Sequence, residues 1–188
     1  MDKNKIKSFA IWARRAMIQA VSDKAYKIGI EKDRIQKADA IQGGFRLQGK
    51  EEILNFPLTE RTKLEGLIDE KGYEQVIEEV AYTWFNRFMG LRYMEVNDYL
   101  PMGIRILSSE VEGKREPDVF NKISEVIEEL ELKSEEIYSL IDTGKNEDRE
   151  KVYQKILVAQ CNKLGEIIPQ MFEKITDYTE LLLSLIHI

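Results

Sequence analysis

Apolar residues recur at steps of three and four along most of this chain, the spacing that gathers side chains on one face of an α-helix. The clearest case is the segment 73–96, whose apolar stripe is wide enough for neighbours on two sides. Pro101 disfavours helical backbone at the residue before it, so the segment should end ahead of that point. We expect it to be the central helix of an all-α domain. The predicted structural core of this helix is Trp84, Phe85, Phe88 and Leu91.

The same spacing predicts further helices. They are expected at 2–27, 32–41, 59–71, 117–130, 134–141 and 146–164, with a last one opening at Pro169. Several have glycine directly after them, and glycine readily adopts the left-handed conformation that closes a helix. The segment 45–58 is the exception, because its apolar residues keep no regular period. The predicted fold class is therefore all-α, a multi-helix bundle of about seven helices with one irregular apolar loop region at 45–58.

A charged stretch with one glycine, at 110–116, is the best candidate for a boundary within the chain. We expect an N-terminal helical subdomain containing the central helix at 1–109, this linker, and a C-terminal helical subdomain at 117–182. The last six residues, 183–188, match the translation of a common sequencing adapter, and we interpret them as an adapter-derived tail. The alternative interpretation is a native apolar tail.

Charge is unevenly distributed along the chain. Residues 1–50 hold twelve Lys and Arg against five Asp and Glu, whereas the remaining residues hold 16 against 29. An electropositive end on an acidic body suits contact with nucleic-acid phosphates or with an acidic partner surface, and the alternative is an ordinary solvated helix face. The candidate DNA contacts are Lys3, Lys5, Lys7, Arg14 and Arg15.

Several kinds of chemistry lack the residues they need. Cys161 is the only cysteine, so no disulfide forms within one chain. His187 is the only histidine and belongs to the stretch that we interpret as an adapter-derived tail, which removes Ser–His and Cys–His nucleophilic pairs. Paired glutamates such as Glu78 and Glu79 point about 100° apart on a helix, which favours solvated faces over acid–base pairs. No apolar run is long enough to span a membrane, and the start has no secretory-signal core. We expect a cytoplasmic protein without a catalytic, cofactor-binding or metal site in these residues.

The aromatic residues of the central segment suggest a second interpretation. Trp84, Phe88 and Tyr93 are of the type that stacks on unpaired bases, with Arg87 and Arg92 as phosphate contacts. Stacking platforms must face solvent, and two of the three aromatic residues lie on the most apolar stripe of the chain. Core packing is the preferred interpretation for that pair. The two arginines are left open, because either one can pair with Glu95 instead.

Four segments carry a resemblance to a known family. They are FAIWARR at 9–15, TWFNRFMGLRYMEVNDYLP at 83–101, ILVAQCNKLGEIIPQMFEKI at 156–175 and TDYTELLL at 176–183. In this order and approximate spacing they resemble the N-terminal region of the PglX family, the adenine-specific DNA methyltransferases of BREX phage-defence systems. The resemblance covers nearly the whole chain. It implies an N-terminal fragment of a protein several times longer.

The resemblance also implies a function for the longer protein. Such enzymes transfer a methyl group from S-adenosylmethionine to the N6 atom of adenine in host DNA, and other BREX components are possible partners. The glycine-rich cofactor turn and the Pro-Pro-aromatic loop of this class do not occur here, since the chain has no Gly-x-Gly and its prolines are isolated. We therefore expect the fragment itself to be catalytically inert. The alternatives are the helical N-terminal domain of a type I restriction-modification methylase subunit, or a non-enzymatic helical interaction module.

Overall fold

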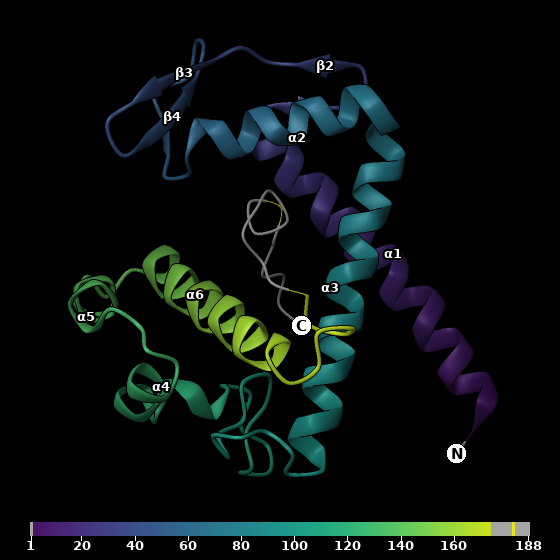
Figure 1. The fold of residues 1–188 in the computed structure, drawn as a ribbon, viewed down its shortest axis with the longest axis vertical. Helices are drawn as coiled ribbons and strands as arrows, with labels where there is room; N and C mark the ends of the chain where they lie inside the picture. The colour runs from purple at the N-terminus through teal and green to yellow at the C-terminus, as the bar shows by residue number, and fades with distance from the viewer. Residues whose placement is uncertain (1, 174–181, 183–188) are drawn as a thin grey trace. The chain divides into compact units, whose positions relative to one another are not determined.

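Six α-helices and one 3₁₀ helix account for most of the residues that the computed structural model describes, which are 2–173 and 182 (Figure 1). The chain divides into one unit of residues 2–85 with Leu182 and another of residues 86–173. The predicted all-α class is wrong in part, because the first unit also contains two small antiparallel sheets. The predicted helix count is also wrong, since the described residues form six α-helices rather than about seven.

The helix α1 (Lys3–Lys27) opens the first unit. The Asp2 carboxylate caps its start by accepting a hydrogen bond of 2.9 Å from the backbone N–H of Asn4. Gly29 follows its end with a φ of +77°, a conformation that a side chain would disfavour. The bounds of the predicted first helix, 2–27, are therefore close to those observed. Figure 1 shows the strands and α2 (Leu58–Lys71) at the C-terminal end of α1.

Five short strands replace a predicted helix and part of a predicted loop. Strands β1 (Ile30–Glu31) and β2 (Arg34–Ile35) pair with each other, and β3 (Ala38–Ile41), β4 (Gly44–Leu47) and β5 (Ile53–Leu54) form a three-stranded antiparallel sheet. The helix expected at 32–41 is therefore wrong, and the loop expected at 45–58 contains two of the strands.

The second sheet has a physical signature that is too short to stand out in the sequence. Phe45 and Leu47 are fully buried, whereas Arg46 between them is exposed, which is the period of two that a strand requires. Gly44 has no room for a side chain, because a Cβ there would lie 2.0 Å from the Leu54 carbonyl oxygen. Strands of two to four residues give little local pattern, so pairing partners distant in sequence determine them.

A buried arginine on α2 holds the first hairpin in place. The Arg61 guanidinium donates hydrogen bonds to the carbonyl oxygens of Ile28 at 2.8 Å and Gln36 at 2.6 Å, and it also pairs with Glu65. Burial lowers the pKa of Arg61 from its ordinary value, and the Glu65 carboxylate counters that effect. The side chain thereby satisfies backbone groups on both sides of the β1–β2 hairpin.

The helix α3 (Tyr73–Val96) has the predicted bounds and continues from the first unit into the second. Of the predicted core residues on this helix, Trp84, Phe88 and Leu91 are buried, whereas Phe85 is only partly buried. Within the second unit, Gly90 lets the Met171 side chain pack directly against the backbone of α3, because a Cβ at this position would lie 2.5 Å from the Met171 sulfur. A glycine in the middle of a helix is thus retained for packing.

A buried glutamate near the end of α3 orders the irregular segment that follows. The Glu95 carboxylate accepts hydrogen bonds from the backbone N–H groups of Ile106 and Leu107. It also accepts one of 3.2 Å from the Ser108 hydroxyl and one of 3.2 Å from the Arg92 guanidinium. Residues 102–109 form no strand, and the N–H groups of Ile106 and Leu107 bond to this carboxylate instead of to a partner strand.

The rest of the second unit is helical. It comprises the 3₁₀ helix η1 (Asp118–Phe120), α4 (Ile123–Glu129), α5 (Ser134–Asp142) and α6 (Asn146–Gly165). The helix predicted at 117–130 is therefore divided, with non-helical backbone at Lys122. Residues 169–173 are not helical, and the remainder of the helix predicted from Pro169 lies outside the described residues, as does the expected adapter-derived tail at 183–188. The division of the chain at 110–116 into two helical subdomains stays a prediction.

Candidate nucleic-acid interface

The five candidate DNA contacts all lie on the exposed surface of α1, in its N-terminal half. From residue 3 to residue 22 this helix carries no acidic side chain, so its own sequence does not neutralise them. Arg14 differs from the other four, because it donates a hydrogen bond of 3.0 Å to the Glu78 carboxylate on α3. In the part of the chain that the structure describes, no carboxylate pairs with Lys3, Lys5, Lys7 or Arg15.

Large apolar side chains share this half of α1 with the cations. Ile6, Phe9, Ile11 and Trp12 are all more than two-fifths exposed, and Trp12 is the most exposed of them at 63%. The rings of Phe9 and Trp12 lie 5.9 Å apart, so the two form one aromatic cluster. The expected apolar stripe of the first helix is therefore covered only from Ala13 onward, where Ala13, Ala20, Val21 and Ala25 are buried.

The base-stacking interpretation of the central segment loses two of its three platforms. Trp84 is 1% exposed and Phe88 is 8% exposed, so neither presents a ring face to solvent. Tyr93 is 61% exposed, and its ring meets that of Tyr99 edge-on with 6.1 Å between the centroids. Of the three aromatic residues proposed for stacking, only Tyr93 has an accessible ring.

The two arginines of that interpretation have protein partners. Arg87 is buried and donates a hydrogen bond of 2.9 Å to the Glu173 carbonyl oxygen. Arg92 pairs with the Glu95 carboxylate at 3.2 Å, which is one of the two pairings left open by the sequence. Burial of a charged side chain requires such a partner, so the fold holds Arg87 away from phosphate. The Arg92 side chain is 46% exposed, and its pairing with Glu95 leaves it partly accessible to solvent.

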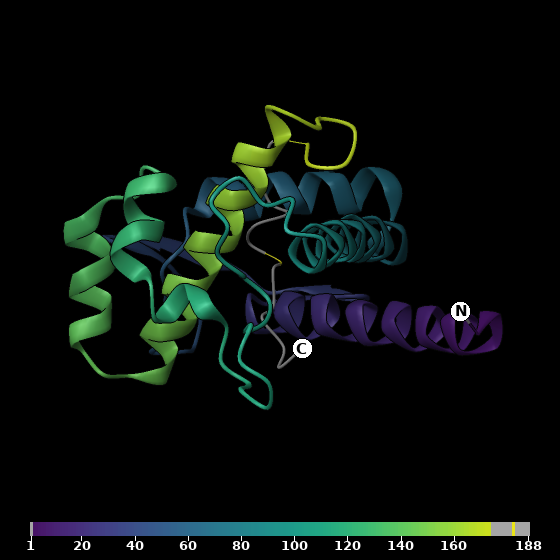
Figure 2. The ribbon, with the colours of Figure 1, turned by 90° about the horizontal axis from the view of Figure 1, so that it is seen from below.

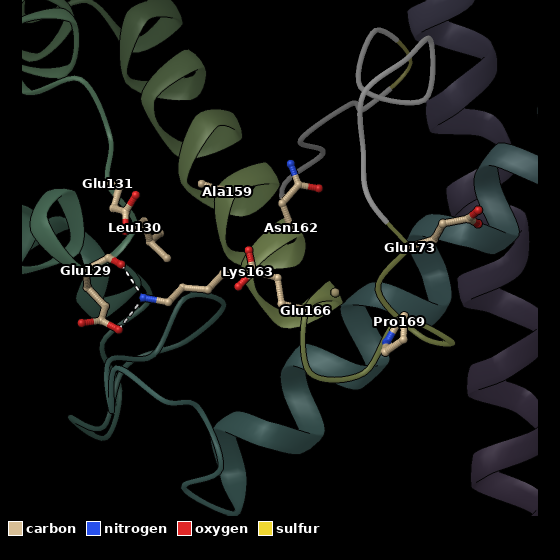
Figure 3. A pocket seen from close by; sticks show the side chains of 10 residues that line it. Glu129, Leu130, Glu131, Ala159, Asn162, Lys163, Glu166, Pro169 and Glu173 are labelled. Carbon is tan, nitrogen blue, oxygen red and sulfur yellow. Dashed lines mark hydrogen bonds and ion pairs between the residues drawn. The ribbon is translucent and has the colours of Figure 1, made fainter.

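A pocket of about 700 Å³ in the second unit has the wrong charge for nucleic acid (Figure 3). Glu131, Glu166 and Glu173 line it, together with Glu129. The Lys163 ammonium neutralises only Glu129, donating hydrogen bonds to its carboxylate at 2.7 Å and to its carbonyl oxygen at 2.5 Å (Figure 3). The remaining carboxylates would repel phosphate groups.

Reactive groups are scarce among the described residues. Burial raises the pKa of the Cys161 thiol to about 12, so the thiol stays protonated and is a poor nucleophile. Residues 2–173 and 182 contain no group of three or more His, Cys, Asp or Glu placed to hold a metal ion. None of the helices in this described part has both the length and the apolar character of a membrane span.

Comparison with known proteins gives the family. No family model matches the chain. The chain is 35% identical over 201 aligned residues to the adenine-specific methyltransferase PglX of Lacticaseibacillus casei strain Zhang. That alignment covers 98% of this chain and 16% of the relative. The chain is 34% identical over 189 aligned residues to the adenine-specific methyltransferase BrxX of Escherichia coli O9:H4 strain HS, covering 97% of this chain and 15% of the relative. The resemblance found in the sequence is thus confirmed: over nearly its whole length the chain corresponds to a segment of the PglX and BrxX adenine-specific methyltransferases, and it spans about one sixth of their length.

Proposed function

We propose that this chain is the N-terminal helical region of a longer, S-adenosylmethionine-dependent N6-adenine DNA methyltransferase of a BREX phage-defence system. The similarity to two adenine-specific methyltransferases over nearly the whole chain is the observation that carries this proposal. The longer enzyme would act on DNA, with other BREX components as partners, and would mark host DNA so that the defence system spares it. It would work in the cytoplasm.

In this proposal the chemistry lies outside the 188 residues. S-adenosylmethionine supplies the methyl group, and binding it requires backbone to approach the cofactor at a glycine-rich turn beside a parallel sheet. The sheets of the first unit are antiparallel and their strands are at most four residues long. The exocyclic amine of adenine must also be reached outside the base stack, in a pocket that grips the flipped base. The chain has no Pro-Pro dipeptide to form that loop.

The role proposed for these residues is to hold the longer enzyme against the phosphate backbone through α1. Lys3, Lys5, Lys7 and Arg15 are exposed cations on a helix segment without acidic residues. Contacts to phosphate position a protein on DNA but carry no information on base sequence. This region would therefore add affinity, and the choice of methylated adenine would be made elsewhere in the enzyme.

Duplex binding at low salt tests the role of α1. The quadruple variant K3Q/K5Q/K7Q/R15Q should lose retention on DNA of any sequence, and the salt slope should fall by about 0.9 for each phosphate contact removed. A control with the same change in net charge is K50Q/K122Q/K133Q/K145Q, which removes four exposed lysines elsewhere. Equal losses in both variants would show that only net charge matters, and undiminished binding would place the contact elsewhere.

Titration calorimetry with S-adenosylmethionine tests whether the cofactor site lies outside these 188 residues. We expect no heat of binding with this chain, whereas the longer enzyme should bind the cofactor and methylate adenine. Micromolar binding by this chain alone would contradict the proposal, because it would place a cofactor site among these helices.

A further inference from the structure

Five consecutive apolar residues, 9–13 with the sequence FAIWA, surround one full turn of α1. Successive residues of an α-helix point about 100° apart, so five in a row reach every side of the helix. A helix that is apolar all round is normally buried on all sides. The first unit does not bury this turn, since Ala13 is the only one of the five residues that is buried.

The exposed side chains form a continuous surface rather than scattered positions. Ile6 and Phe9 precede Ala13 by seven and four residues and so continue the stripe that is buried farther along the helix. Trp12 extends this surface through its ring contact with Phe9, at 5.9 Å between centroids. Figure 2 shows this half of α1 running away from the strands of its own unit. Single exposed apolar residues are common, but a continuous group on one helix marks an interaction surface.

A groove of about 510 Å³ adjoins this surface within the first unit. Ala10 and Ile18 of α1 line one side, and Ala81, Tyr82 and Phe85 of α3 line the other. Tyr82 is 65% exposed. The groove can therefore accommodate an apolar side chain from a protein surface that docks on α1.

We propose that the N-terminal half of α1, residues 3–13, docks on an apolar surface rimmed by carboxylates in the remainder of the longer methyltransferase. This inference rests on the proposed function. We call the docking element the α1 collar, and define it by Ile6, Phe9, Ile11 and Trp12.

The positive charge of α1 and the greater length of the relatives both favour a docking surface within the longer methyltransferase. Residues 3–22 contain cations and no anion, so a second basic surface would be repelled and a carboxylate rim would be attracted. The relatives have about six times the length of this chain, which leaves ample protein to cover one helical turn. Lys5 lies on the same side of α1 as Phe9 and Trp12 and would face the carboxylate rim. Lys3 and Lys7 lie on another side of the helix and stay available for phosphate while the collar docks.

The test compares this chain alone with a chimera. In the chimera, this chain replaces the segment of the Lacticaseibacillus casei methyltransferase with which it aligns. The fluorescence of Trp12 is obtained as the difference between each protein and its Trp12→Phe variant. In the isolated chain, acrylamide should quench Trp12 as it quenches a free indole. In the chimera, the quenching of Trp12 should fall to the level of the buried Trp84.

Stability provides an independent measurement. The double variant Phe9→Ser/Trp12→Ser should leave the thermal midpoint of the isolated chain unchanged and lower that of the chimera by several degrees. The matched control is Tyr26→Ser, which removes a side chain that is 59% exposed near the other end of α1. The control should change neither midpoint.

The outcomes separate this inference from the proposed function. A chimera that methylates adenine in DNA while Trp12 stays open to acrylamide would overturn the docking and leave the proposed function intact. Protection of Trp12 without methylation would support the docking and contradict the proposed reaction. Sedimentation of the isolated chain decides a third possibility, because self-association abolished by the double variant would assign the collar to a second copy and overturn the proposal.

Discussion

Each unit contains a buried charged side chain that binds the backbone of a neighbouring segment, Arg61 in the first unit and Glu95 in the second, and these two charges have opposite signs. In the first unit Arg61 of α2 donates to the carbonyl oxygens on either side of the β1–β2 hairpin. In the second unit Glu95 of α3 accepts from the N–H groups of Ile106 and Leu107. Both residues are at most 2% exposed. In both units a helix side chain supplies hydrogen bonds to backbone groups that have no partner within their own segment.

Because the two charges differ in sign, the backbone groups that they satisfy differ in how much it costs to leave them without a partner. A carbonyl oxygen has two lone pairs and tolerates partial satisfaction, whereas a buried N–H has a single hydrogen to place. Removing the anion of the second unit should therefore cost more than removing the cation of the first. Charge state adds a second difference, because arginine remains protonated at any ordinary pH and a carboxylate does not.

The largest effect is expected from Glu95→Ala. Two buried N–H groups and the Arg92 guanidinium lose their shared acceptor, which should lower the free energy of unfolding by about 3–4 kcal/mol. Urea unfolding followed by circular dichroism measures this loss. Glu95→Gln keeps one acceptor oxygen and should cost clearly less. If Glu95→Ala were as stable as the parent, the carboxylate would not be organising the segment 104–108.

Arg61→Met should cost less, about 2–3 kcal/mol, because the carbonyl oxygens of Ile28 and Gln36 lose their donor while the apolar volume is largely kept. Hydrogen exchange should show faster opening of the β1–β2 hairpin than of any segment in the second unit. The matched variant Arg61→Lys retains the charge, but an ammonium lacks the planar fork that reaches several oxygens. We expect Arg61→Lys to restore only part of the stability. Full restoration would mean that charge alone matters.

Acid should weaken the second unit before the first. Burial tends to raise the pKa of Asp118, but hydrogen bonds from the Ser109 hydroxyl at 2.6 Å and the Glu110 N–H at 2.8 Å hold it below its ordinary value. A lowered carboxyl pKa gives stability that is present above about pH 4 and is lost as the pH falls through the pKa of the folded state. No such loss applies to Arg61.

Hydrogen exchange between pH 5 and pH 2.5 measures this difference segment by segment. Residues 105–118 should lose protection on acidification earlier than residues 28–36. Asp118→Asn should remove part of the pH dependence of that segment. Equal loss in both segments would indicate global acid unfolding instead.

The smallest effect is expected from Arg14→Gln, which breaks an ion pair on the surface of the first unit. Both partners are more than half exposed, with 65% for the Arg14 side chain and 53% for Glu78. Exposed pairs contribute little because water screens them, so the change in unfolding free energy should stay below about 0.5 kcal/mol. Thermal unfolding checks this value. A loss comparable to that of Arg61→Met would show that burial is not what separates the two arginines.

The sequence by itself determined the long helices and the family. The bounds of α3 follow from a period of three and four that runs over the whole helix and from Pro101 after it. The end of α1 follows from Gly29. These signals are local, so they can be read without knowing what packs on the helix. The family resemblance rests on ordered motifs, and 35% identity over nearly the whole chain to an adenine-specific methyltransferase supports it.

Only the tertiary structure decided where the sheets lie and which apolar residues are exposed. The strands have two to four residues, and their stability depends on pairing and on Arg61, whose acceptors lie 25 and 33 residues away. Periodicity also fails to predict burial in α1. The apolar stripe from Ile6 to Val21 is one continuous pattern in the sequence, but it is covered only from Ala13 onward. Periodicity shows which side chains share a face, whereas burial depends on whether another element reaches that face.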